Sequence, residues 1–456
     1  MNVNLALNKE DFFNRYGRAK YVSIYTLGCK VNQYDTEAVA EQFKERGYEV
    51  VPFKEIADIY IVNTCTVTHL SDRKCRQILR KTKKINPFSI LVAMGCYAQA
   101  VSDKIQDEVT EVDIVIGTNR RKELIDIVEN FSISNHGTNN ELITNYVDNI
   151  MEIAEFEELT ISQMSEHTRV YLKIQEGCNN YCTYCIIPYV RGKIRSRKED
   201  NVIKEASRLA INNFKEIVLT GIHVASYGKD LSNVSLNTLL PKLNNVDGIE
   251  RIRMSSIEPI VVTNEFVNML VTTKKMCQHF HLSLQSGSNS VLNRMKRRYT
   301  TQQYFDSVMI LRNLWPDIAI TTDIIVGFPG ETEQEFLETL EFVQKVGFSQ
   351  IHIFPYSNRE GTIASKMSEQ ISSQIKDERV KRLAQIEAKL RYAFLDRECG
   401  KIVEVLFETS QNGISTGYTS NYLKVEVATD EILTNKINKV SIDKRVGDVL
   451  SATLIK

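Results

Sequence analysis

The chain has 456 residues, and its 57 Lys and Arg side chains balance its 57 Asp and Glu side chains to a formal net charge of zero. A chain of this length exceeds what one hydrophobic core usually supports, so we expect two or three domains. The zero net charge excludes bulk electrostatic attraction to nucleic acid, which leaves only local basic clusters to bind it. The sequence has no apolar run of about 18 residues and no signal-peptide pattern at its start, so we expect a cytoplasmic protein that does not associate with a membrane.

The first predicted domain, residues 20–130, alternates short apolar runs with segments of helical apolar spacing. The predicted strands are 21–27, 57–62, 89–94 and 112–116, and the predicted helices are 34–46 and 71–84. This alternation predicts an α/β domain with an open parallel sheet and helices on both faces.

Three cysteines of this domain follow three different predicted strands: Cys29, Cys65 and Cys96. Because parallel strands place their sites at their carboxyl ends, we expect the three thiols to converge. Three thiolates could hold a 4Fe-4S cluster and leave its fourth iron open. The alternative is three buried thiols that pack as small apolar residues, which is also our expectation for Cys75, Cys277 and Cys399.

Residues 131–166 are poor in apolar periodicity and are predicted to be a linker, in which Asn135–Asn140 is a loop signal. Residues 167–397 resume the alternation with longer units and six predicted strands. These strands are 170–175, 216–220, 251–255, 279–285, 318–326 and 350–355. Six such units predict a partial (β/α)6 barrel, whose site would lie at the carboxyl ends of the strands.

A second set of cysteines, Cys178, Cys182 and Cys185, has the spacing C-x-x-x-C-x-x-C after the first strand of this domain. Three closely spaced thiolates suit a 4Fe-4S cluster with one open iron. Zinc is the weaker alternative, because no nearby His or second cysteine pair supplies a fourth ligand.

Further polar residues and glycines lie at or near the ends of the other predicted strands. Glu258 and Asp323 could bind the ribose or amino group of a cofactor, Gly221 and Gly327 could let backbone approach it, and Gln285 could face the cavity. The alternatives are strand-end capping, turn geometry and an internally bonded amide. We interpret His223 and His352 as structural histidines rather than ligands.

The cysteine triplet, with Tyr184 before its last cysteine, resembles the radical S-adenosylmethionine superfamily. Together with Cys29, Cys65 and Cys96 it resembles the methylthiotransferases of that superfamily, over nearly the whole chain. Within the family, residues 26–33 and 282–288 are most similar to members that modify threonylcarbamoyladenosine in tRNA.

The resemblance implies two 4Fe-4S clusters and S-adenosylmethionine as cofactors. In the family, the cluster on Cys29, Cys65 and Cys96 carries the sulfur that is methylated. The cluster on Cys178, Cys182 and Cys185 cleaves a second S-adenosylmethionine to activate the base. A radical route suits carbon 2 of an adenine, whose hydrogen is not acidic enough for a side-chain base. The implied partners are the anticodon loop of tRNA, an electron donor and a sulfur source.

Several alternatives stay open at this point. The substrate could instead be an isopentenyl adenosine in tRNA or an aspartate of a ribosomal protein. The chain could be an iron-sulfur RNA-binding module without catalysis, or its first cluster could only relay electrons. No catalytic side chain beyond the cluster ligands is predicted.

Three basic runs, 73–84, 191–198 and 294–298, are candidates for phosphate contact or simply solvated faces. A long charged helix is predicted over 376–396. Residues 398–456 contain short alternating segments at 402–407, 422–427 and 449–454, which predict a small β-barrel. By resemblance this is an RNA-binding appendage, in which Tyr418 and Tyr422 are either base-stacking or plain strand residues.

Overall fold

The computed structural model describes residues 3–134, 144–164 and 168–455. The predicted loop Asn135–Asn140 lies outside these residues. The chain forms two compact units. The first consists of Met1–Ser165, Gln175–Tyr181 and Cys185–Arg197, and the second of Glu166–Ile174, Cys182–Tyr184 and Lys198–Lys456.

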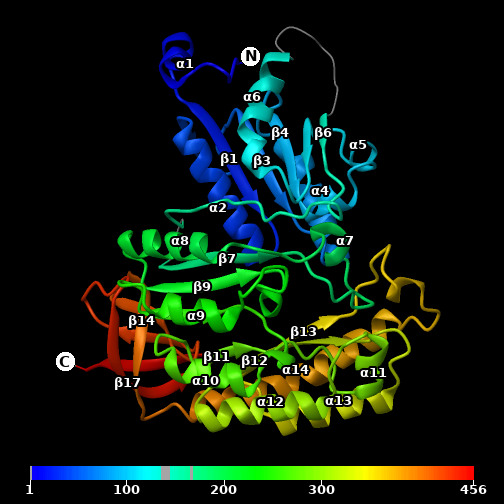
Figure 1. Cartoon of the computed structure of the whole chain (residues 1–456), viewed down its shortest axis with the longest axis vertical. Coiled ribbons are helices and arrows are strands. Elements are labelled where there is room, and N and C mark those ends of the chain that lie inside the picture. Colours follow the sequence, from blue (N-terminus) through cyan, green and yellow to red (C-terminus); the bar gives the residue numbers. More distant parts are fainter. Residues whose placement is uncertain (1–2, 135–143, 165–167, 456) are drawn as a thin grey trace. The chain divides into compact units, whose positions relative to one another are not determined.

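The first unit is built on a six-stranded parallel sheet of order β2-β1-β3-β4-β5-β6. Figure 1 labels β1, β3, β4 and β6 of this sheet. Its strands are β1 (Lys20–Thr26), β2 (Tyr48–Val50), β3 (Ile59–Thr64), β4 (Ile90–Gly95), β5 (Ile114–Ile116) and β6 (Thr144–Tyr146). Its helices are α1 (Lys9–Tyr16), α2 (Lys30–Glu45), α3 (His69–Thr82), α4 (Cys96–Ala100), α5 (Ile105–Glu108), η1 (Arg121–Glu123), α6 (Leu124–Ser134) and α7 (Ile187–Arg191).

Apolar side chains of this sheet alternate between two cores. Ile59 and Ile61 of β3 pack with residues of α1, α2 and α6, whereas Tyr60 and Val62 pack with residues of α3, α4 and α5. Neighbouring residues of a strand point to opposite faces, so this division places helices on both sides of the sheet. The predicted doubly covered parallel sheet is confirmed.

Two edge strands were not predicted. β2 and β6 have three residues each, too few to show an apolar pattern. β6 lies within the predicted linker and pairs with β5, and Leu159 and Ile161 of the same segment are buried.

The second unit contains the six predicted strands of the partial barrel. They are β7 (Arg169–Glu176), β9 (Glu216–Gly221), β10 (Arg251–Met254), β11 (His279–His281), β12 (Ala319–Val326) and β13 (Gln350–Pro355). The strand orders are β10-β9-β7 and β11-β12-β13. The last two residues of β7, Gln175 and Glu176, belong to the first unit and pair there with β8 (Arg195–Ser196). The isolated parallel bridges Ile252–Met276 and Ile257–Leu282 join the β10 and β11 segments.

Helices follow these strands, as a parallel barrel requires (Figure 1). They are α8 (Glu199–Ile211), η2 (Val224–Ser226), α9 (Leu236–Asn244), η3 (Pro259–Val261), α10 (Asn264–Thr272), α11 (Asn289–Arg294), α12 (Thr301–Leu314), α13 (Glu333–Val346), η4 (Ala364–Lys366) and α14 (Ser373–Asp396). Helix α14 contains the predicted segment 376–396. Among the helices that the structure describes, none combines the length and the apolar character needed to cross a membrane.

The end of the second unit is a closed five-stranded barrel of order β14-β15-β16-β18-β17. Its strands are β14 (Ile402–Gln411), β15 (Ile414–Thr419), β16 (Lys424–Ala428), β17 (Ile437–Val446) and β18 (Val449–Leu454). The predicted small β-barrel is confirmed, but β15 and β17 were missed. Ser, Thr, Lys and Asp occupy much of these two strands, and they mask the apolar alternation.

Candidate active site

The structure brings Cys29, Cys65 and Cys96 to one edge of the first sheet. Cys29 caps α2 directly after β1, Cys65 follows β3, and Cys96 begins α4 directly after β4. These three strands are neighbours and parallel, so their carboxyl ends share an edge. A Cβ atom placed on Gly28 would lie 3.1 Å from the Cys65 Sγ, which shows how closely the Cys29 turn packs against Cys65.

Arg191 places a buried guanidinium against this set of cysteines. Its Nε donates a hydrogen bond to the Cys96 Sγ at 3.1 Å, and its Nη1 pairs with Glu176 at 3.0 Å and with Asp35 at 3.3 Å. Burial raises the pKa of the Cys96 thiol to about 12, and the positive charge of Arg191 opposes that rise. At neutral pH Cys96 is therefore a protonated thiol, and its sulfur accepts the hydrogen bond from Arg191.

Cys75 lies beside this set but serves a different purpose. Its sulfur accepts a hydrogen bond from the Cys65 backbone N–H at 3.4 Å and donates one to the Cys65 carbonyl at 3.2 Å. The side chain is fully buried in the core of that face of the sheet. These bonds fix the backbone that carries Cys65, as expected of a structural thiol.

The loop of the second cysteine set is held by a glycine. Gly177 has φ +72°, and a side chain there would overlap the Lys193 carbonyl oxygen. The next residue, Cys178, donates its backbone N–H to the Gly192 carbonyl at 3.0 Å. Only glycine permits both this backbone conformation and this close approach.

Arg297 connects Cys182 with Glu258. Its Nη1 lies 3.3 Å from the Cys182 Sγ, and its Nη2 lies 2.8 Å from a Glu258 carboxylate oxygen. Its Nε donates to the Tyr299 hydroxyl at 2.9 Å. Burial works against the charge of Arg297, yet Tyr184, Tyr299, Cys182 and Glu258 together keep its pKa well above the ordinary value. Glu258 also pairs with the His223 Nε2 at 3.3 Å.

The remaining predicted site residues lie at strand ends, with different surroundings. Gly221 is the last residue of β9. Gln285 has φ +77°, and its backbone N–H donates to the Asp323 carbonyl at 2.9 Å. The Gly327 N–H donates to the Glu331 carboxylate at 2.6 Å, which fits the turn-geometry interpretation of this glycine.

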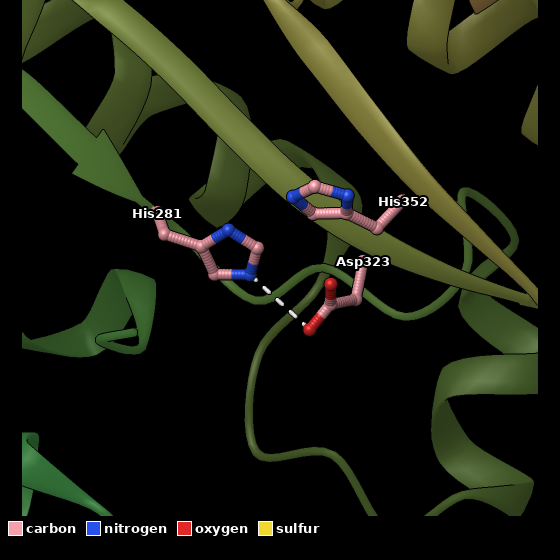
Figure 2. A group of neighbouring side chains, drawn as sticks. All are labelled: His281, Asp323 and His352. Atoms are coloured by element: carbon pink, nitrogen blue, oxygen red, sulfur yellow. Dashed lines mark ion pairs between the residues drawn. The ribbon is translucent and has the colours of Figure 1, made fainter. Parts of the chain in front are cut away.

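Asp323 belongs to a cluster with His281 and His352 (Figure 2). The ligand atoms of the three side chains all lie within 4.8 Å of one another. The His281 Nε2 lies 3.2 Å from an Asp323 oxygen, and the two imidazole rings stack with centroids 5.7 Å apart.

The prediction of phosphate contact is wrong for the arginines of residues 191–198. Arg191, Arg195 and Arg197 are all buried. Arg191 is paired with Asp35 and Glu176, and Arg197 with Glu158 at 2.7 Å. A buried, paired guanidinium cannot reach a phosphate, and the sequence shows only a basic run in which buried and exposed cations look alike.

Tyr418 and Tyr422 pack within the second unit. Their rings stack with centroids 5.2 Å apart, and Arg169 lies over both, at 4.5 Å and 5.0 Å. Arg253 lies 4.6 Å from the Tyr422 ring. The arginines therefore occupy ring faces that a base would need, which favours the interpretation as packing residues.

Two family profiles match the chain. The profile described as uncharacterized protein family UPF0004 matches residues 21–117, and that of the radical SAM superfamily matches residues 172–343. The first range holds Cys29, Cys65 and Cys96, and the second holds Cys178, Cys182 and Cys185.

Curated relatives align along most of the chain. It is 42% identical over 429 residues to the threonylcarbamoyladenosine tRNA methylthiotransferase of Bacillus subtilis (strain 168), with 93% of this chain and 94% of the relative covered. The enzyme of the same description from Aquifex aeolicus (strain VF5) is 40% identical, with 89% and 96% covered. The tRNA-2-methylthio-N(6)-dimethylallyladenosine synthase of Thermoanaerobacter sp. (strain X514) is 36% identical, with 96% and 94% covered.

Solved structures support the fold at low sequence identity. A radical S-adenosylmethionine methyltransferase from Kitasatospora setae superposes with a TM-score of 0.54 at 13% identity, covering 74% of this chain and 73% of that one. A cobalamin-dependent S-adenosylmethionine radical enzyme superposes with a TM-score of 0.52 at 12% identity, covering 83% and 57%. The expected radical S-adenosylmethionine fold is confirmed.

Proposed function

Because the chain belongs to the radical S-adenosylmethionine methylthiotransferase family, we propose that it adds a methylthio group to carbon 2 of threonylcarbamoyladenosine next to the tRNA anticodon. The observation that carries this proposal is the convergence of Cys29, Cys65 and Cys96 at one sheet edge, in a chain that also has the Cys178 triplet. The identity of 42% and 40% to threonylcarbamoyladenosine enzymes, against 36% to the dimethylallyladenosine synthase, favours the first substrate.

We assign one 4Fe-4S cluster to Cys29, Cys65 and Cys96 and a second to Cys178, Cys182 and Cys185. The donor sets fit, because each has three thiols and each has a sulfur that accepts a hydrogen bond from a buried arginine. When bound, the clusters and S-adenosylmethionine supply the radical and sulfur-transfer chemistry that amino-acid side chains lack.

In this proposal, residues of the chain position the ligand sulfurs and balance their negative charge. Arg191 and Arg297 each place a guanidinium against a ligand sulfur. Arg191 is fixed by Asp35 and Glu176, and Arg297 by Glu258. Glu258, held by Arg297 and His223, presents a carboxylate near Cys182 for the amino or ribose groups of S-adenosylmethionine. Gly221, Gln285, Asp323 and Gly327 stay predictions as cofactor contacts.

The rest of the assignment follows from the same family. We propose that residues 20–130 form the methylthiotransferase domain, 131–166 a linker, 167–397 the radical domain and 398–456 an RNA-binding barrel. The enzyme acts in the cytoplasm, where an electron donor and a sulfur source must serve it.

Two experiments test this function. Mass spectrometry of tRNA nucleosides from cells lacking the gene should show no methylthio-threonylcarbamoyladenosine, unless another enzyme supplies it. If methylthiolated dimethylallyladenosine disappeared instead, the substrate would be that of the dimethylallyladenosine synthase.

The second experiment uses the Cys29→Ala variant with reconstituted clusters. S-adenosylmethionine cleavage should continue while the methylthio product is lost. Slowed cleavage would instead indicate that the first cluster relays electrons, and a wild-type protein that cleaves no S-adenosylmethionine would indicate a binding module.

A further inference from the structure

His281, Asp323 and His352 share one face of three adjacent strands (Figure 2). His281 of β11 is the register partner of Thr321, and Asp323 of β12 is the register partner of His352. Thr321 and Asp323 are two residues apart, so all four side chains point to the same side of the sheet. The opposite side is packed, since Thr322 and Ile324 are fully buried.

The polar cluster continues into an apolar surface on the same face. Ile325 and Phe354 are a register pair of β12 and β13, two residues beyond Asp323 and His352 and therefore on the same face. Phe354 is 45% exposed, so its ring has a face available for stacking. His352 beside it is also exposed. The face therefore offers an aromatic platform next to two imidazoles and a carboxylate.

Hydrogen bonds link this face to the surroundings of Cys182. The His281 carbonyl accepts the N–H of Ile257, the residue before Glu258. The Ser283 carbonyl, two residues after His281, accepts from the Tyr299 hydroxyl at 2.6 Å, and Tyr299 bonds to Arg297. Arg297 in turn contacts both Glu258 and the Cys182 Sγ. The cluster thus belongs to the same end of the barrel as the proposed radical site.

We propose that this face binds the modified adenine itself, with the base on Phe354 and its N6 substituent on His281, Asp323 and His352. Asp323 then contacts the substrate in place of the cofactor. The inference rests on the proposed function and assigns the residues that select the substrate. A threonylcarbamoyl group carries a carboxylate, a hydroxyl and urea N–H groups. The exposed His352 imidazole supplies a donor for the carboxylate. His281, whose ring nitrogens contact the Thr321 hydroxyl at 3.0 Å and Asp323 at 3.2 Å, holds Asp323 as an acceptor for the hydroxyl or an N–H.

The polarity of the face also argues against a dimethylallyl substituent. That group has no polar atom, so its binding would bury the imidazoles and the Asp323 carboxylate without new partners. Phe354 would still stack on the base, because every base has a π-face. We therefore expect two separable effects of substitution. Changes at Phe354 affect binding of the base, and changes at the polar residues affect recognition of the substituent.

The test uses the full-length enzyme with both clusters, and anticodon stem-loops that differ only in carrying threonylcarbamoyladenosine or plain adenosine. The dissociation constant of the plain stem-loop, divided by that of the threonylcarbamoyladenosine stem-loop, measures recognition of the substituent. His352→Leu and His281→Leu should each reduce that ratio by about 10-fold to 100-fold. His352→Gln keeps a donor and should restore part of it. Phe354→Ala should weaken binding of both stem-loops equally.

Lys381→Ala on α14, an exposed cation outside this face, is the matched control and should leave the ratio unchanged. Thermal unfolding of each variant separates impaired recognition from impaired folding. An unchanged ratio in folded His352→Leu and His281→Leu would overturn the inference.

A metal ion is the competing occupant, since two imidazoles and a carboxylate also suit a divalent transition metal. Stoichiometric zinc or manganese in the wild type, absent from His352→Leu, would assign the cluster to a metal and overturn the inference. Failure of the proposed function is distinguishable, because the wild type would then not methylthiolate the threonylcarbamoyladenosine stem-loop at all.

Discussion

Two buried arginines define the chemistry of the site at the scale of single residues. Arg191 and Arg297 each donate a hydrogen bond to a cysteine sulfur while paired with carboxylates. Hydrogen bonds to ligand sulfurs are one of the means by which a protein sets the reduction potential of an iron-sulfur cluster. Since burying a guanidinium without partners is costly, these carboxylates are a condition for that role.

We expect Arg191→Met to destabilise the first unit by about 3 kcal/mol, because it removes a buried cation that pairs with the buried Asp35 and Glu176 carboxylates. Urea unfolding of the cluster-free protein measures the change. Arg73→Met removes an exposed arginine of the same unit and should change stability by no more than about 0.5 kcal/mol. Equal effects of the two substitutions would contradict the structural role of Arg191.

Gly177→Ala should prevent the loop of Cys178 from forming, since the new Cβ would overlap the Lys193 carbonyl. The reconstituted variant should lose about half of its iron, if each site holds one cluster of equal size. Gly400→Ala is the matched control, because Gly400 also has positive φ, at +83°, but nothing lies within 4 Å of its Cβ position. That substitution should lower the free energy of unfolding by only about 1 kcal/mol and should leave the iron content unchanged. Full iron content in Gly177→Ala would refute the argument.

At the scale of elements, helix α3 is the basic segment that keeps its cations available. Its inner side buries Asp72, Cys75 and Leu79, whereas Arg73, Lys74, Arg80 and Lys81 are exposed. The helix follows the Cys65 loop directly. This basic run, 73–84, thus combines exposed cations with a position next to Cys65.

We expect Arg73→Ala combined with Lys74→Ala to weaken tRNA binding and to lower its salt dependence, by about one unit of slope for each phosphate that the variant no longer neutralises. Binding titrations at several salt concentrations measure both quantities. Lys381→Ala combined with Lys389→Ala removes two exposed cations from α14 and should leave the slope as in the wild type. An unaltered slope in the α3 variant would exclude this helix from the RNA interface.

At the scale of the whole molecule, the sequence allowed the location of the candidate site to be predicted, but not the buried arginine that lies against its cysteines. Cys29, Cys65 and Cys96 could be placed at one edge because strand ends are visible in apolar runs and turns. Arg191 could not be placed beside Cys96, because that contact joins residues 95 positions apart and the sequence shows only a basic run. The pairing of Asp323 with His352 likewise depends on strand register, which single-sequence patterns do not fix.

The stability of the second unit should depend on acid through Glu216. Burial works against its charge, but Arg253 at 2.6 Å more than compensates and lowers its pKa. A lowered folded-state pKa contributes stability above the unfolded value of about 4.3, and this contribution disappears as the pH falls through the folded pKa. We expect the thermal stability of the wild type to decline below about pH 4.3. The Glu216→Gln variant should be less stable than the wild type at pH 7, and its stability should fall less steeply as the pH is lowered. A wild-type profile in that variant would refute the assignment.

The contact between Arg251 or Arg253 and the terminal barrel has a consequence for how this family can diversify. Arg251 bonds to the carbonyls of Glu404 and Tyr418, and Arg253 to those of Thr419 and Ser420. Every amino acid carries the same carbonyl, so these four hydrogen bonds do not depend on which side chains stand at Glu404, Thr419 and Ser420. Relatives can therefore differ in side chain at Glu404, Thr419 and Ser420 and still keep these hydrogen bonds between the barrel and the rest of the unit.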